Sequence, residues 1–97
     1  MVKKDIYKAL HIRDRMLNIA EKIIQTIEGK EWEVNFIQLG KNKNKTETIL
    51  ADCYYFGTQH REYIALRYSI PMSLFEDTED LEAKARKLYT EGEIYCV

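Results

Sequence analysis

The sequence predicts an α+β domain in which helices cover one face of a three-stranded antiparallel meander sheet. Three observations favour this fold class. Residues 5–28 repeat apolar side chains with the period of a helix, the segments within 31–70 read as three strands, and a shorter helical pattern follows Pro71. The 97 residues have the length of one domain, so residues 1–97 are expected to fold as a single unit.

The first expected element is a long N-terminal helix over residues 5–28. Its apolar side chains cover about half of the helix circumference. Asp5 suits a first helical turn, and Gly29 suits the position just past a helix end. The apolar stripe is broader than one contact needs, so a sheet or a second copy of the chain should cover it.

Arg13 interrupts this stripe, because its helical angle falls among apolar residues. A charge at such a position must be paired or must extend its head group to water. An internal salt bridge satisfies that need, and so does a contact with a second copy. The second alternative predicts a homodimer whose interface includes Arg13, Leu17 and Ile24.

The first predicted strand, residues 31–39, alternates apolar and polar side chains from Trp32 to Phe36. The lysine-rich turn "GKNKNK" follows, and residues 46–56 form a second strand rich in β-forming residues. After the short connection "GTQH", residues 61–70 form the third strand, which Pro71 ends.

A short second helix is expected after Pro71. "SLFE" has the spacing of a capping box, and "EDTEDLEAKARKLYTEG" places acidic residues before basic ones, as the helix dipole prefers. Gly92 suits the end of this helix. Residues 93–97, "EIYCV", are a candidate C-terminal strand.

Helices on one side of the sheet leave the other side open. The alternation assigns one set of side chains to the core: Trp32, Val34, Phe36, Ala51, Cys53, Ile64, Leu66 and Tyr68. It assigns another set to the open side: Glu33, Asn35, Ile37, Leu50, Asp52, Tyr54, Arg61, Tyr63, Ala65 and Arg67. A one-residue bulge would exchange these assignments.

The open side supplies the first candidate partner-binding residues, which are Tyr54, Arg61, Tyr63 and Arg67. Tyrosine and arginine are typical of protein-interface hot spots, and they also stack on nucleic-acid bases. Glu33 and Asp52 disfavour nucleic acid, because phosphate binding needs a continuous basic path. An ordinary solvated sheet with cross-strand pairs is the alternative without a binding role.

An acidic segment supplies the second group of candidates: Glu76, Asp77, Glu79, Asp80 and Glu82. Residues 76–97 hold seven acidic against three basic side chains, whereas residues 1–30 hold seven basic against four acidic. The overall net charge is −1. This distribution indicates either two solvated helix surfaces or a dipolar molecule with an acidic contact patch.

Catalytic and cofactor signatures are lacking in the sequence, so neither a catalytic residue nor a cofactor is assigned and an enzyme is not expected. Two cysteines and two histidines without ligand spacing predict no metal site. No apolar leader and no uncharged run of about 20 residues is present. We therefore expect a soluble cytoplasmic protein with free thiols and no membrane partner.

The α-β-β-β-α order resembles the double-stranded-RNA-binding domain. That family carries lysines where this chain has Glu79, Asp80 and Glu82, so the resemblance stops short of the phosphate-binding motif. The order also resembles small phage-encoded anti-CRISPR inhibitors. That resemblance implies a non-enzymatic protein that blocks a nuclease with carboxylates, which the acidic segment would supply.

Together these patterns predict a small binding protein that occupies the surface of a host protein, such as a nuclease or another defence protein, as a phage or mobile-element inhibitor. A nucleic-acid-binding regulator that uses the Tyr/Arg side and the "GKNKNK" turn is the first alternative. A small-ligand binder with a pocket at a dimer or helix–sheet boundary is the second.

Overall fold

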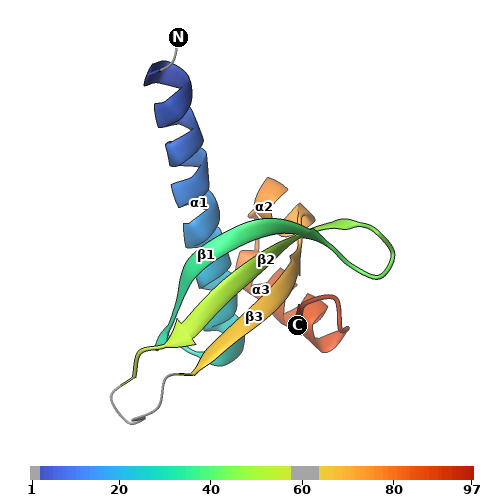
Figure 1. The fold of residues 1–97 in the computed structure, drawn as a ribbon. Coiled ribbons are helices and arrows are strands. Elements are labelled where there is room, and N and C mark those ends of the chain that lie inside the picture. The colour runs from blue at the N-terminus through green and yellow to red at the C-terminus, as the bar shows by residue number, and fades with distance from the viewer. Residues whose placement is uncertain (1–2, 58–63) are drawn as a thin grey trace.

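The computed structural model describes the backbone of residues 3–57 and 64–97 and the side chains of residues 12–57 and 64–97. The elements in chain order are α1 (Lys3–Glu28), β1 (Trp32–Lys41), β2 (Glu47–Tyr55), β3 (Ala65–Pro71), α2 (Ser73–Glu76), α3 (Leu81–Thr90) and β4 (Tyr95–Cys96). All neighbouring strands are antiparallel, in the order β1-β2-β3-β4 (Figure 1). The α+β prediction and the C-terminal strand are confirmed.

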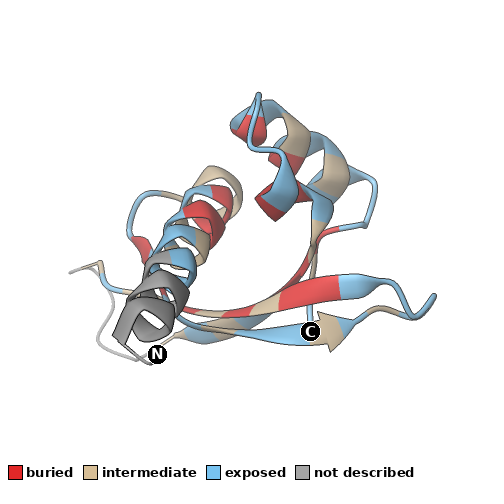
Figure 2. Cartoon of the chain, turned by 90° about the horizontal axis from the view of Figure 1, so that it is seen from above, coloured by how far each residue is buried: buried red, intermediate tan, exposed pale blue. Residues whose placement is uncertain are grey.

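The core lies between the sheet and the helices, which all cover the same face (Figure 2). From α1 the buried side chains include Ile19, Ala20, Ile23 and Ile24. The sheet and the C-terminal half contribute a second group: Trp32, Val34, Ile49, Ala51, Cys53, Tyr68, Ile70, Leu74, Leu81, Ala85 and Ile94. The apolar stripe of α1 is therefore covered by the sheet and by α3 over the last part of the helix.

The first half of α1 projects beyond the outer edge of β1 (Figure 1). Ile12 is 49% exposed, and Arg13 is exposed as well. Arg13 therefore lies on a part of α1 where its side chain reaches solvent, which is one of the arrangements that the sequence allows for this charge. The projection also lengthens the molecule, whose extents are 47 × 32 × 25 Å.

Polar side chains of α1 fix the helix on the sheet. Gln25 Nε2 donates a hydrogen bond to the Trp32 carbonyl oxygen at 3.0 Å, and the Val34 N–H donates to Glu21 Oε1 at 3.2 Å. The Tyr68 hydroxyl donates to Glu28 Oε1 across the core. The helix ends as predicted, since Gly29 has a φ of 127° and its N–H donates to the Gln25 carbonyl oxygen.

A β-bulge in β1 corrects the assignment of two side chains. Val34 pairs with Cys53 and Phe36 pairs with Asp52, so Asn35 is an extra residue in β1. Phe36, predicted for the core, is exposed on the helix-free face. Ile37, predicted for the open side, packs against the core instead. The bulge shifts the alternation by one residue from this point onward.

The second helical region also differs from the expectation of one helix. "SLFE" is itself the short helix α2, with Met72 as its N-cap and no side-chain capping bond. Residues 77–80 then separate α2 from α3. Asp80, the N-cap of α3, has a left-handed φ of 51°, which turns the chain too sharply for a continuous helix.

Candidate functional site

The helix-free side of the sheet is the candidate site, and we call it the open face. Antiparallel pairing aligns Phe36, Asp52 and Arg67 in one cross-strand row and Glu33, Tyr54 and Ala65 in the next. Residues that face each other across strands share one side of a sheet. The rows therefore hold these six side chains on rigid strands, with no helix above them (Figure 2).

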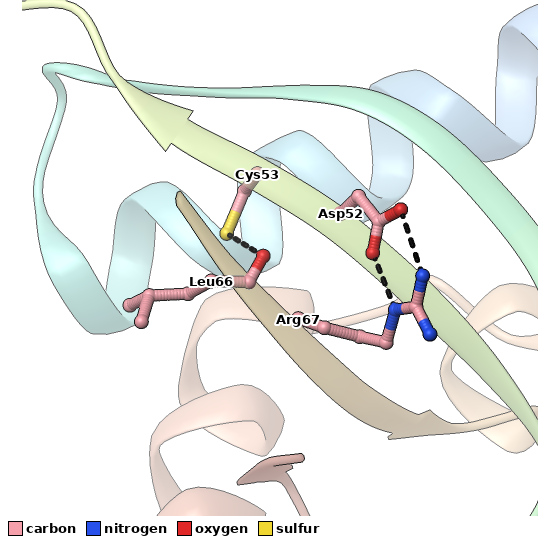
Figure 3. A network of polar contacts seen from close by, with 4 residues as sticks. All are labelled: Asp52, Cys53, Leu66 and Arg67. Atoms are coloured by element: carbon pink, nitrogen blue, oxygen red, sulfur yellow. Dashed lines mark hydrogen bonds and ion pairs between the residues drawn. The ribbon is translucent and has the colours of Figure 1, made fainter. Parts of the chain in front are cut away.

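Arg67 and Asp52 form a two-point ion pair on the open face. Arg67 Nε lies 2.6 Å from Asp52 Oδ1, and Arg67 Nη2 lies 3.2 Å from Asp52 Oδ2 (Figure 3). The hydrogen bonds that Arg67 donates to Asp52 raise the pKa of Arg67, and the carboxylate balances its charge. The pair holds the guanidinium in a fixed orientation. Because two of its donors already bond to Asp52, it is less able to bind a phosphate group.

Tyr54 is fixed in the neighbouring row. Its hydroxyl donates to Glu33 Oε2 at 2.7 Å, and the ring is half-buried. Each of the two rows thus contains a polar contact between neighbouring strands. An ordinary solvated sheet without a binding role would also contain such cross-strand pairs.

Phe36 distinguishes the open face from an ordinary solvated sheet. Its side chain is 42% exposed beside the Asp52–Arg67 pair. A shallow hollow of about 370 Å³ is lined by Asn35, Phe36, Asp52, Ala65 and Arg67, together with parts of Cys53 and Leu66. The sequence held a signal for this placement, since Phe36 and Ile37 are consecutive apolar residues and Leu39 continues the phase of Ile37.

Cys53 lies behind this hollow and faces the core. Its Sγ donates to the Leu66 carbonyl oxygen at 3.5 Å (Figure 3). Burial, followed by the negative charges of Glu28, Cys96 and Asp52, raises the pKa of the Cys53 thiol to about 11. The group is therefore a packed thiol at neutral pH and has none of the thiolate character that a nucleophile needs.

The acidic segment lies in the helix layer, on the side of the sheet opposite the open face. Glu76, Asp77, Glu79, Asp80 and Glu82 are all exposed. Asp77 accepts the Glu79 N–H at 3.0 Å and lies 3.3 Å from Lys84 Nζ, and these contacts lower its pKa. The two predicted groups of partner-binding residues consequently form two separate surfaces.

The remaining predicted residues are distributed as follows. Arg61 and Tyr63 lie outside the described residues. Of the predicted dimer residues, Arg13 is exposed and Leu17 is half-buried, whereas Ile24 is fully buried in the core of its own chain. Ile24 is thus covered without a second copy.

A wider hollow of about 640 Å³ lies between α1 and the segment that joins α2 to α3. Its lining is Asp14, Arg15, Asn18, Ile19, Lys22, Thr78 and Leu81. Mixed charges line it, and it is open to solvent. Within residues 12–57 and 64–97, no three metal-ligating side chains come together. Over the described part of the chain, no helix has the length and apolarity needed to cross a membrane.

Comparisons of the chain with protein-family models, with curated proteins and with solved structures found no match.

Proposed function

We propose that the chain is a small non-enzymatic binding protein that occupies the surface of a partner protein through its open face. The observation that carries this proposal is Phe36, a large apolar side chain that the bulge holds on a helix-free sheet. Around it, the charged groups Asp52 and Arg67 are already paired with each other. An apolar centre with a satisfied polar rim is the usual anatomy of a protein interface.

The electrostatics of the open face favour a protein partner over a nucleic acid. Asp52 balances Arg67, and Glu33 adds a carboxylate to the next row. A nucleic-acid surface would need free cations along a continuous path. A protein partner can leave the Asp52–Arg67 pair at the rim of the interface. An ion pair that stays in contact with solvent there changes the binding free energy little. The resemblance to anti-CRISPR inhibitors makes a bacterial defence nuclease the first partner class to test.

The experiment compares two exposed aromatic residues on opposite sides of the molecule. Phe36 is 42% exposed on the open face, and Tyr89 is 45% exposed on α3. After the partner has been captured from bacterial lysate and identified, its affinity is measured for Phe36→Ala and Tyr89→Ala. We expect Phe36→Ala to lose about 2 kcal/mol or more of binding free energy, as a hot-spot residue does. Equal affinities for both variants would refute the open face as the binding surface.

The acidic segment is the competing surface, and its exposure favours testing it in the same assay. All five of its carboxylate side chains are exposed, and Asp77 is the member that is paired with a lysine. If it mimics nucleic-acid charge, Glu79→Lys with Asp80→Lys should slow association and reduce its salt dependence. A normal association rate for this double variant, together with a loss for Phe36→Ala, assigns binding to the open face alone.

A further inference from the structure

The outer edge of β1 is protected along its first part. Gln25 of α1 bonds to the Trp32 carbonyl oxygen, and Glu21 of α1 accepts the Val34 N–H. These side chains occupy backbone groups that a strand edge otherwise offers to another strand. Beyond the bulge, no described side chain bonds to the outward backbone groups of β1, so the remaining edge from Phe36 to Lys41 is open.

The pairing with β2 shows which backbone groups lie on that open edge. Side chains of α1 bond to the Trp32 carbonyl and the Val34 N–H, so the backbone groups of these two residues point away from β2. Their partners in β2 are Tyr55 and Cys53, which are two residues apart. Ile37, Leu39 and Lys41 continue this set after the bulge. Their N–H and C=O groups therefore point away from β2, because outward and inward pairs alternate along an antiparallel ladder. The open edge offers three donors and three acceptors.

Leu39 lies at the centre of this edge and is 72% exposed. It pairs with Ile49, a core residue, so it faces the helix side of the sheet. Neither α1 nor α3 covers it. The first half of α1 projects past the same edge of β1 (Figure 1). An added strand could therefore lie beside β1, where it would pair with the open edge and cover Leu39.

We propose that a second copy of the chain fills this space, with the two β1 strands paired antiparallel about Leu39. In this register Leu39 faces Leu39 of the other copy, and Ile37 faces Lys41. All three outward residues then exchange both hydrogen bonds with their counterparts. The two four-stranded sheets join into one continuous sheet, and each exposed leucine is buried against its copy.

The charges along β1 favour a second copy over an unrelated strand. Glu31 directly precedes the strand and Glu33 lies near its start, whereas Lys41 ends it and the turn that follows contains Lys43 and Lys45. Antiparallel self-pairing brings the lysine turn of one copy toward the acidic start of the other. Opposite charges that face each other across strands stabilise the pairing, whereas like charges oppose it. The proposed arrangement leaves the open face of each copy accessible.

Charge variants at the two-fold axis test the register. In analytical ultracentrifugation, the wild-type protein should have a mass of twice 11.5 kDa at high concentration, and this mass should fall toward 11.5 kDa on dilution. Leu39→Lys and Leu39→Glu should each remain at 11.5 kDa, and their equimolar mixture should return to twice that mass. Residue 39 faces itself only in this register, so recovery on mixing supports the proposal. A wild-type monomer at every concentration, or a mixture that stays monomeric, would overturn it.

Cross-linking provides a second test that does not depend on charge. On a Cys96→Ser background, Leu39→Cys should form a disulfide-linked dimer on mild oxidation, because paired strands place facing Cα atoms about 5.5 Å apart. Phe36→Cys is the matched control, since its side chain is also exposed. In the proposed register it lies about 20 Å from its copy, at about 3.3 Å per residue. Equal cross-linking of both variants contradicts the proposal.

Discussion

The two cysteines of the chain lie in contrasting surroundings. Cys53, on β2, is buried in the core, whereas Cys96, on β4, is exposed. Burial disfavours the Cys53 thiolate and raises its pKa from 9.0 to about 11. The sequence predicted free thiols for both residues. It predicted the core position of Cys53 correctly as well, because β2 alternates regularly around it.

The raised pKa of Cys53 predicts a loss of stability in alkaline solution. The folded state holds the thiol proton more tightly than the unfolded state, so this contribution is complete below pH 9.0 and is lost as the pH rises toward about 11. Urea unfolding at a series of pH values measures it. Cys53→Ala should show a shallower fall in the free energy of unfolding over this range than the wild type. Cys96→Ser is the control: it removes one of the smaller causes of the raised pKa and leaves the burial of Cys53, the largest cause, in place, so it should keep most of the wild-type slope.

Among the elements, regular patterns were predictable and irregular ones were not. The helix from residue 5 to 28 and the strands around Cys53 follow one period throughout, so their positions agree with the structure. The bulge at Asn35 and the left-handed Asp80 are single-residue irregularities. Asp80 leaves no trace in the periodicity of its segment, and the bulge leaves only the consecutive apolar pair Phe36 and Ile37, either of which could face the core. Consequently Phe36, the central residue of the candidate site, was assigned to the wrong face.

The hairpin between β1 and β2 contains a second left-handed residue, and it yields a prediction. Lys45 has a φ of 61°, a conformation that a side chain disfavours and glycine adopts freely. Lys45→Gly should therefore raise the free energy of unfolding by about 0.5 to 1 kcal/mol. Lys45→Ala removes the same charge and keeps the Cβ atom, so it should change stability little. Chemical denaturation of the two variants gives the difference, and a less stable glycine variant would contradict this reasoning.

At the scale of the whole molecule, charge is separated by layer. Exposed carboxylates gather around the α2–α3 segment in the helix layer, and the open face carries internally paired charges. The lysine-rich turn at 41–45 is the main basic feature of the sheet. The described side chains of the sheet present no continuous basic path to a nucleic acid.

This distribution predicts weak binding to DNA and RNA. At physiological salt, dissociation constants for single- and double-stranded oligonucleotides should stay above roughly 10 μM, because few phosphates can be neutralised together. Fluorescence anisotropy over a range of salt concentrations measures this. Tight binding with a steep salt dependence would instead support the nucleic-acid alternative. In that case Lys41→Ala and Lys43→Ala would show whether the turn is responsible.

The bulge at Asn35 also determines where β1 can change its length. Because Asn35 has no partner in β2, its deletion leaves Val34 opposite Cys53 and Phe36 opposite Asp52. Deletion of Gln38, three residues later, would instead move Leu39 and its successors to the opposite side of the sheet. We therefore expect the first deletion to fold and the second to fail, as measured by circular dichroism and urea unfolding. Within this strand, Asn35 is the position at which evolution or an engineer can gain or lose a residue without exchanging the two faces.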